Sequence, residues 1–424
     1  MLTLLVFLGT LGGTIAIGLP IGFCLGIAGI ALMFFSGNPD AIIVARRMVS
    51  GIDNFTLMAI PFFMLAGEIM NRAGIVTDIL RFANAIVGWL RGGLGHVNVM
   101  ASMLFAGVTG SAVADTSALG MLEIPMMEKA GYDKDYACAL TAASSVMGPI
   151  IPPSIPMIIY GMISGTSIAK LFLAGAVPGV LIAVSLGGLN WYISAKRRYP
   201  REKRMPFADI FFVFIKALPV LMLPVIILGG ILSGIFTPTE AAAVAAVYAA
   251  LVATVLYKLP LREFFPILVQ AAKTSSIVML VCGAASIVTW LLTISMVPQS
   301  IANFVFKASL NPLVVLLGIN IFLFLVGCVI DLVPALFILV PVMTPLARSI
   351  GIDPIHFGTI VVCNLCLGLI TPPVGTVLYV CCSIGKIELG RLVRHIAPMI
   401  FAVLLVLIVV TYFPKVVLFL PNLF

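Results

Sequence analysis

Two short proline-rich stretches decide the fold of this chain: GPIIPPSIP at 148–156 and GLITPPVG at 368–375. Each lies within a long apolar run of the sequence. Proline removes a backbone donor, and its ring clashes with the preceding turn of a helix. Neither stretch can be continuous helix, so the sequence predicts a broken helix at both places.

The composition places these broken helices in a membrane. The chain has 424 residues, of which 62% are hydrophobic and only 9% charged, whereas a soluble domain carries roughly 25% charged residues. Most of the surface therefore does not face water, which excludes a soluble enzyme, a nucleic-acid binder and a disordered chain. Barrel strands alternate apolar and polar residues, but this chain has long unbroken apolar runs. We expect an all-α polytopic membrane protein embedded in a lipid bilayer.

Apolar stretches of spanning length recur along the whole chain. They lie at about 20–36, 55–71, 97–110, 136–166, 171–193, 210–233, 237–257, 275–294, 311–330, 356–385 and 396–420. Two amphipathic pieces, 74–93 and 297–310, are expected to lie in the membrane interface, with an ordinary short span as the alternative. The N-terminus lacks a basic segment and a small-residue cleavage site, so we expect it to be retained as two helical pieces broken near Gly18 and Pro20.

One short loop holds six of the 24 basic residues, in SAKRRYPREKRMPF at 194–207. The positive-inside bias predicts that the loop at 194–209 is cytoplasmic. No aromatic or glycine-rich recognition pattern accompanies it, so no nucleic-acid partner is expected.

No catalytic constellation is present in the sequence. Cys363 and Cys366 have redox or metal spacing, but no second pair or histidine follows nearby, which favours buried thiols. There is no histidine cluster, serine–histidine pairing or nucleotide loop. We expect the protein not to be an enzyme.

An internal repeat relates the two halves of the chain. Matching features are Gly131-x-Asp133 with Gly351-x-Asp353, Gly148 and Pro152-Pro153 with Gly368 and Pro372-Pro373, Gly110 and Asp115 with Gly327 and Asp331, and, more weakly, Pro20 with Pro238. Matches in register over this length favour duplication. Broken segments in matching places of two halves are typical of the site of a secondary transporter.

The chemistry of such breaks suits a small cation and an anion. Non-helical backbone at membrane depth is tolerated only where protein or a water-filled cavity surrounds it. Its free carbonyls, together with serine and threonine hydroxyls, form an oxygen cage suited to Na⁺. The positive ends of the half-helices can face an anionic substrate.

The acidic residues sharpen this hypothesis. Asp115 and Asp331 occupy matching positions, and a carboxylate at membrane depth marks a cation or proton path. Asp115 has an alternative role as the cap of a hairpin helix. Ser144 and Ser145, one turn before the first break, either serve an ion or bond back to the preceding turn.

Two further acidic residues are expected to be structural. Glu240 follows Pro238 at the start of a helix. Glu68 is expected to pair with Arg72, one turn later.

Four motifs together resemble the large membrane subunit of TRAP transporters, the tripartite ATP-independent periplasmic systems. They are GSAVADTSALG at 110–120, the two breaks, and FTPTEAAAVAAVYA at 236–249. The resemblance covers essentially the whole chain. It implies two inverted-topology repeats with re-entrant hairpins and broken helices, arranged as an elevator-type scaffold plus transport domain.

The resemblance also implies a function, a location and partners. These are Na⁺-coupled uptake of an organic acid across the bacterial inner membrane, with Na⁺ as coupling ion and no other cofactor. A periplasmic substrate-binding protein would deliver the acid, and a small four-helix membrane subunit would be required. Because the chain begins directly with the large subunit, we expect the small one to be a separate polypeptide.

The same resemblance divides the chain into five parts. Scaffold helices and an interfacial arm occupy 1–93, and the first half of the transport domain occupies 94–170. Connecting and scaffold helices with the second arm follow at 171–310. The second half of the transport domain is 311–385, and a C-terminal membrane helix is 386–424.

Residue by residue, the resemblance predicts a first hairpin tip at Gly110–Ser117, a second hairpin near Asp331–Thr344, and unwound segments at Gly148–Ser154 and Gly368–Gly375. The predicted Na⁺ ligands are Ser111, Asp115, Ser144, Ser145, Gly148 and Pro149 in the first half, and Asp331, Gly368, Thr371 and Pro372 in the second. The predicted substrate-binding residues are Ser154, Asn364, Val374 and Gly375.

The identity of the substrate stays open in the sequence. Sialate-like and keto-gulonate-like sugar acids are closest by resemblance, with C4-dicarboxylates as a further class. None of the four motifs contains an arginine that could bind a carboxylate. A stand-alone Na⁺/dicarboxylate-type symporter that needs no binding protein is the alternative function.

Overall fold

The computed structural model describes residues 2–37, 40–300, 303 and 311–424. Over these residues the chain is almost entirely helical and contains no strand. The prediction of an all-α membrane protein is confirmed. Within the described ranges, six helices are long and apolar enough to cross a membrane, or seven if the bent pair at 41–72 forms one span.

One group of helices comes from the first quarter of the chain and from its middle. The helices are α1 (Leu2–Ala16), α2 (Ile21–Phe35), α3 (Ala41–Ile52), the 3₁₀ turn η1 (Phe55–Met58), α4 (Ala59–Arg72), α5 (Val76–Val87), α11 (Phe207–Leu232), α12 (Pro238–Val255), η2 (Leu261–Glu263) and α13 (Phe264–Ile294). Their packing is crossed, because α2 lies on α13 and α12 lies on α4. Pro20 precedes α2, and Pro238 is the first residue of α12. The two helices that the weak repeat relates therefore each pack on a helix from the other half of the chain.

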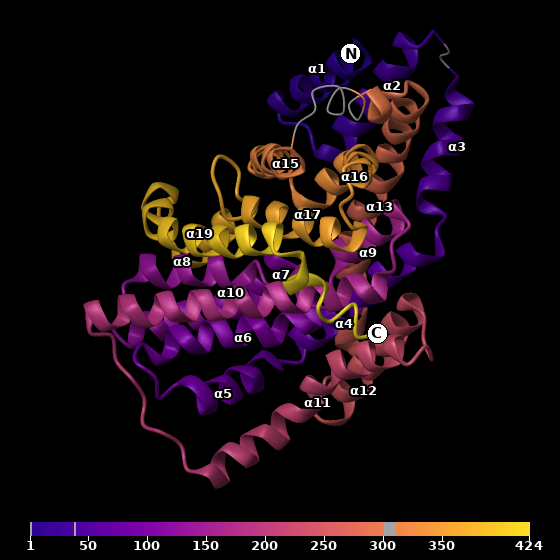
Figure 1. Ribbon diagram of the computed structural model, residues 1–424. Helices are drawn as coiled ribbons and strands as arrows, with labels where there is room; N and C mark the ends of the chain where they lie inside the picture. The colour runs from indigo at the N-terminus through magenta and orange to yellow at the C-terminus, as the bar shows by residue number, and fades with distance from the viewer. Residues whose placement is uncertain (1, 38–39, 301–302, 304–310) are drawn as a thin grey trace.

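Two helical hairpins and two broken helices form a second group. The first half contributes α6 (Gly93–Thr109), α7 (Ala112–Lys129), α8 (Lys134–Ser145) and α9 (Ile155–Ser164). The second half contributes α15 (Pro312–Gly327), α16 (Leu332–Ser349), α17 (Pro354–Gly368) and α18 (Thr376–Gly385). The helices α10 (Ile168–Arg197), α19 (Leu389–Tyr412) and α20 (Pro414–Leu418) complete the chain. In Figure 1, α6, α8, α10 and α19 lie side by side, and α3 runs along the edge of the molecule.

The first hairpin, α6–α7, enters and leaves on the side of the basic loop that follows α10. Before α6, the carbonyl of Gly88 accepts from the backbone N–H of Glu202 in that loop, at 3.1 Å. After α7, Asp133 forms an ion pair with Arg197 at the end of α10. Both ends of the hairpin are therefore on one side, which makes it re-entrant.

The second hairpin, α15–α16, approaches from the opposite side. Near the end of α16, Arg348 donates to the carbonyl of Ser164 at 2.8 Å. Ser164 is the last residue of α9, just before the turn into α10, and so lies near the end of α10 that is remote from the basic loop. The two halves therefore have inverted topology.

The structure corrects several expected boundaries. The first tip is only Gly110 and Ser111, because Ala112 already begins α7, and the second hairpin turns at 328–331. The apolar stretches at 136–166 and 356–385 are each two helices with a break between them. The sequence did not predict α3, which has no buried residue and whose cap Asp40 accepts from the N–H of Ile42 at 2.8 Å.

The structure tests the predictions for the two amphipathic segments and for Glu240 and Glu68 to different extents. The first amphipathic piece forms α5, while most of the second, at 297–310, lies outside the described residues. Glu240 and Thr237 form a reciprocal capping box at the start of α12, as expected for a structural role. The predicted pairing of Glu68 with Arg72 is wrong, because Arg72 forms an ion pair with Glu263 at 2.9 Å.

Candidate functional site

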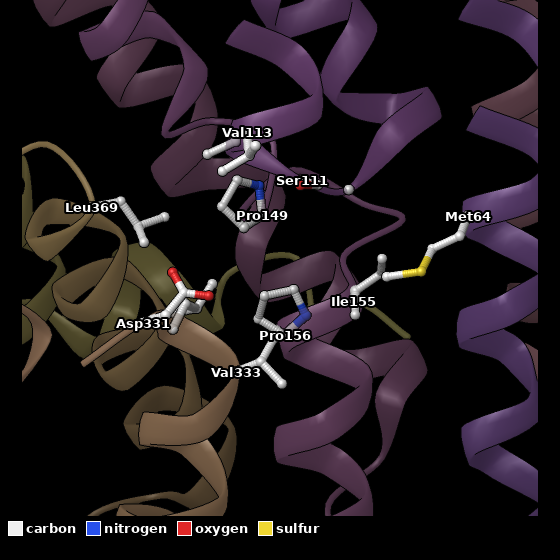
Figure 2. Close-up of a pocket in the computed structure, with 12 residues that line it drawn as sticks. Met64, Ser111, Val113, Pro149, Ile155, Pro156, Asp331, Val333 and Leu369 are labelled. Atoms are coloured by element: carbon white, nitrogen blue, oxygen red, sulfur yellow. The ribbon is translucent and has the colours of Figure 1, made fainter. Parts of the chain in front are cut away.

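Both hairpin tips and both broken helices meet around one small pocket. Its volume is about 80 Å³. The lining residues are Met64, Gly110, Ser111, Ala112, Val113, Pro149, Ile155, Pro156, Asp331, Leu332, Val333 and Leu369. Figure 2 shows Met64 reaching in from a separate helix, on the side opposite Asp331 and Leu369. The pocket therefore lies where the two halves meet and where a helix of the other group touches them.

Glycines allow each tip to lie directly against its break. Gly110 has a φ of +61°, and a Cβ there would be 2.7 Å from the carbonyl oxygen of Pro153. In the second half, a Cβ on Gly368 would lie 2.4 Å from the carbonyl carbon of Gly327. Only glycine permits such close approach of two backbones. Gly368 thus packs tightly against the second tip, while its role as a Na⁺ ligand stays a prediction.

Ser111, not Asp115, caps α7. The hydroxyl of Ser111 accepts from the N–H of Ala114 at 3.4 Å. Asp115 lies in the first turn of α7, fully buried, and neither carboxylate oxygen has a hydrogen-bond partner among the described residues. The alternative of Asp115 as a capping residue is therefore wrong. Its carboxylate is the kind of group that requires a cation or a proton.

A buried polar network lies behind the first tip. Asn98 donates to Glu123 at 2.5 Å and to Thr141 at 2.7 Å, and it accepts from Ser144 at 2.9 Å. Ser102 donates to Ser144 at 3.0 Å and lies next to Asp115. The network thus extends from Glu123 to Ser102, beside Asp115, without a hydrogen bond to its carboxylate. Sequence reasoning missed Asn98 and Glu123, although a glutamate within an apolar hairpin helix was a visible signal.

Three predicted hydroxyls donate to nearby backbone carbonyls. Ser145 donates to Ala142 at 2.9 Å, and Thr371 donates to Leu367 at 2.8 Å. Ser154 caps α9 by accepting from the N–H of Met157 at 3.2 Å, and it donates to the carbonyl of Pro149. A hydroxyl that donates its hydrogen still has lone pairs for a cation. The geometry is compatible with cation ligands at Ser145 and Thr371, whereas Ser154 is occupied as a cap.

Asp331 supplies the acidic group of the pocket itself. It precedes α16 without capping it, and Thr376 donates to its Oδ1 at 3.4 Å. Figure 2 shows its carboxylate directed into the pocket. Asp331 and Asp115 are therefore not equivalent in space, because one faces the pocket and the other is buried behind the opposite tip.

The structure does not bring the other predicted substrate residues into this pocket. Asn364 donates to Asn320 on α15 at 2.8 Å and lines a separate, mostly apolar cavity between α15, α17 and α19. Gly375, with a φ of +53°, begins α18, and the N–H of Val374 donates to Cys328 at 3.1 Å. Of the predicted ion ligands, Ser111, Pro149 and Asp331 line the pocket. Gly148 lies against Ser111, and Pro372 lies in the second break.

Two further cavities continue from the pocket towards the side of the basic loop. The next cavity shares Met64, Ser111 and Ile155 with the pocket, and the third shares Glu68 and Asn71 with the second. The third has a volume of about 530 Å³ and includes Arg72 and Gln270. In this conformation adjoining cavities thus lead from the tips towards the side of the basic loop.

The fold has a relative among solved structures. The crystal structure of the YdaH transporter of Alcanivorax borkumensis superimposes with a TM-score of 0.66, covering 88% of this chain and 87% of that one at 12% identity. At this identity the likeness shows the fold alone.

Comparison of sequences extends the likeness to the whole chain. The sialic acid TRAP transporter large permease protein SiaM of Vibrio cholerae is 43% identical over 97% of this chain and 97% of its own length. The 2,3-diketo-L-gulonate TRAP transporter large permease protein YiaN of Escherichia coli is 42% identical over 98% of each chain. Residues 8–416 match the family model described as the tripartite ATP-independent periplasmic transporter, DctM component. The chain therefore belongs to the DctM family of TRAP transporter large permease subunits.

Proposed function

We propose that this chain is the membrane pathway of a Na⁺-coupled transporter that imports an organic acid by an elevator mechanism. A periplasmic binding protein delivers the acid, and a separate small four-helix subunit completes the membrane complex. The observation that carries the proposal is the single pocket built from both tips and both breaks, with Asp331 facing it.

The carboxylates support coupling to a cation. Asp115 is fully buried without a hydrogen-bond partner among the described residues. Burying an isolated carboxylate costs far more than burying a neutral group, so the site favours binding of a positive charge. Hydroxyl, carbonyl and carboxylate oxygens are suited to Na⁺. We assign one Na⁺ to the first tip with Ser145 and Asp115, and a second to Asp331 with Thr371 and the second break.

Cavity sizes separate the ion sites from the substrate site. A pocket of about 80 Å³ between the tips has room for an ion and water, whereas sites for small organic ligands usually occupy ~300–1,000 Å³. The adjoining cavity beside Ser111 and Met64 is also small, about 70 Å³. We therefore place the acid where these two cavities open along α4 into the third, of about 530 Å³. The names of the relatives in Vibrio cholerae and Escherichia coli favour a sugar acid, with sialate first.

The packing supports an elevator. The hairpins and broken helices pack on one another and on α10 and α19, while α2, α4, α12 and α13 form their own crossed pairs; the two groups meet mainly where α5 packs on α6 and α13 packs on α16. The pocket lies at the boundary of the two groups, since Met64 of α4 closes it opposite the hairpin tips. Movement of the hairpins and broken helices along the crossed pairs would carry the pocket from one membrane side to the other.

A reconstituted system tests the function. The chain, co-purified with a candidate small subunit, is placed in proteoliposomes with binding protein loaded with labelled N-acetylneuraminate, 2,3-diketo-gulonate or malate. We expect uptake of a sugar acid only with binding protein outside and an inward Na⁺ gradient. Equal uptake without binding protein would favour the stand-alone Na⁺/dicarboxylate-type symporter, and uptake indifferent to Na⁺ would contradict the coupling.

A further inference from the structure

A cavity of about 360 Å³ lies on the other side of the pocket, away from the basic loop. Its walls come from α3 and α13 on one side and from α9 and α16 on the other. The polar residues among them are Arg47, Ser50, Asn54, Ser286, Thr289 and Thr293, with Trp290 beside them. The four hydroxyls of this lining already donate to backbone carbonyls, so the donors suited to an anion are the guanidinium of Arg47 and the side-chain amide of Asn54.

The cavity lies at the outer side of the membrane. Met162 and Ile163, which line it, come directly before the turn that leads into α10, and the basic loop follows the opposite end of α10. Trp290 is likewise close to the end of α13, whose beginning carries the Arg72–Glu263 ion pair. Glu263 and Trp290 are thus about 40 Å apart along the helix, at 1.5 Å per residue.

Arg47 lines this cavity, and no charge partner for it is present in the part of the chain that the structure describes. Its guanidinium carbon lies 4.6 Å from the centre of the Trp290 ring. Its backbone carbonyl accepts from Ser286 at 2.5 Å, which fixes α3 on α13. Among the described residues, its side chain takes part in none of the ion pairs. The donors of a positioned guanidinium are therefore available for a ligand.

The arginine at the cytoplasmic end is in the opposite situation. Arg72 borders the large cavity on that side, but Glu263 accepts from both its Nε and its Nη2, at 3.1 and 2.9 Å. Its charge is therefore compensated. The outer arginine is open to an anion and the inner one is paired, which favours capture outside and release inside.

We propose that Arg47, with the amide of Asn54 in the same cavity, is the outer binding site for the carboxylate of the incoming acid. The proposal rests on the proposed function and supplies the arginine that the sequence motifs lack. A guanidinium binds a carboxylate through two parallel hydrogen bonds, and the face of Trp290 provides an apolar surface beside them. The site lies on α3 and α13, so the acid binds there before it reaches the hairpin tips.

Fluorescence quenching tests the site without any transport. In a protein with Trp89→Phe and Trp191→Phe, in zwitterionic nanodiscs, Trp290 is the remaining tryptophan. Iodide is the probe, and neutral acrylamide reports accessibility alone. We expect Arg47→Gln to lower the iodide quenching constant about twofold or more, with acrylamide quenching unchanged, because an unpaired cation concentrates anions locally. Arg46→Gln, on the adjacent position of α3, is the matched control and should leave both constants unchanged.

Competition then identifies the ligand class. N-acetylneuraminate or malate, at constant ionic strength, should protect Trp290 from iodide in the parent protein and not in Arg47→Gln. Protection by anionic lipid in place of carboxylates would assign the site to a phospholipid phosphate and overturn the proposal. Unchanged iodide quenching in Arg47→Gln, or an equal effect of Arg46→Gln, would overturn it as well.

Transport gives an independent readout. In the reconstituted system, Arg47→Gln should raise the KM for the delivered acid about tenfold, while Arg46→Gln should not. A normal KM in Arg47→Gln, in a system whose parent transports, would refute the site and leave the proposed function intact. Failure of the parent to transport any tested acid would refute the function, while the quenching experiment would still decide whether Arg47 binds carboxylates.

Discussion

Asp115 and Asp331 show how two residues in matching sequence positions acquire different surroundings. Asp115 is enclosed behind the first tip, next to Ser102 and the Asn98 network. Asp331 faces the pocket beside Thr376. The duplication placed one carboxylate near each tip, but one residue fewer between Gly327 and Asp331 leaves the second outside its helix.

The first prediction concerns the carboxylate of Asp115. Replacement Asp115→Ala removes the buried negative charge that a cation would compensate. We expect Na⁺-dependent uptake in proteoliposomes to fall more than about tenfold, which corresponds to ~1.4 kcal/mol or more of lost ion binding. Thermal stability in detergent without Na⁺ should not fall, because the carboxylate has no hydrogen bond to lose among the described residues.

Ser117→Ala on the same helix is the matched control for Asp115. Its hydroxyl only bonds back to Val113 at 2.8 Å, so uptake should be retained. Unaltered Na⁺ dependence of Asp115→Ala would remove this residue from the ion site.

The second prediction concerns the glycine contact at the second tip. A methyl group in Gly368→Ala would lie 2.4 Å from a backbone carbon of Gly327. Because backbone cannot rotate away, we expect a loss of ~1–3 kcal/mol of stability, measured as a lower melting temperature in detergent. Gly390→Ala, where nothing lies within 4 Å, should be neutral. Equal melting temperatures of the two variants would show that the second tip is looser than described.

Some of these residues were predictable from the sequence and others were not. Pro149, Ser111 and Asp331 carry chemistry that stands out in an apolar run, and they line the pocket. Met64 and Ile155 do so as well, but an apolar residue looks the same in a core as in a binding pocket. Asn364 was assigned to the substrate although it faces α15, because the rotation of a helix about its axis cannot be known before its packing.

At the scale of elements, the breaks were predictable and the partners of the charged residues were not. Proline and glycine act on the local backbone, so 148–154 and 369–375 are non-helical as their sequences require. Arg72 donates to Glu263, which is 191 residues away in the sequence. The sequence suggested Glu68 as its partner, because Glu68 lies four residues before Arg72 on the same helix, and that prediction was wrong. Likewise α3 was missed, because its apolar residues are too few for a span and its contacts lie on α13.

The third prediction concerns an ion pair between elements of the two halves. Arg391 on α19 donates through two nitrogens to Asp135 on α8, at 3.0 and 2.7 Å. Asp135 is buried, so Arg391→Met leaves a carboxylate without its partner. Because Arg391 itself is largely exposed, we expect a loss of about 1–2 kcal/mol rather than the larger cost of a fully buried pair.

The melting temperature of Arg391→Met measures this loss. Arg394→Met, one turn further along α19, forms no ion pair among the described residues and is the control. The double variant Asp135→Asn with Arg391→Met should recover part of the loss, and no recovery would show that the two side chains are not coupled.

At the scale of the whole molecule, the fourth prediction concerns relative movement of the two helix groups. A Cβ on Gly67 of α4 would lie 3.5 Å from the Cα of Thr109 on α6, which is within reach of a disulfide. In Gly67→Cys with Thr109→Cys, oxidation should stop uptake, and reduction should restore it. The elevator requires this result, because the bond joins a moving hairpin to a stationary helix.

A second cysteine pair provides the control for movement. Gly327→Cys with Leu365→Cys has a similar separation of 3.4 Å, but it joins two elements of the same group. Its oxidation should leave uptake largely intact. Loss of uptake on oxidation of both pairs, or of neither, would contradict rigid movement of one group along the other.

The shared pocket also has an evolutionary consequence. Each half supplies one tip and one break, so one half alone cannot enclose the pocket. An ancestor with a single half would therefore need a second copy inserted in the membrane with the opposite orientation. A chain that inserts in both orientations must carry similar numbers of positive charges on the loops of its two sides. A one-sided basic run such as that from Lys196 to Arg204 would be harmful in such an ancestor and advantageous only once fusion had fixed the pairing of the halves.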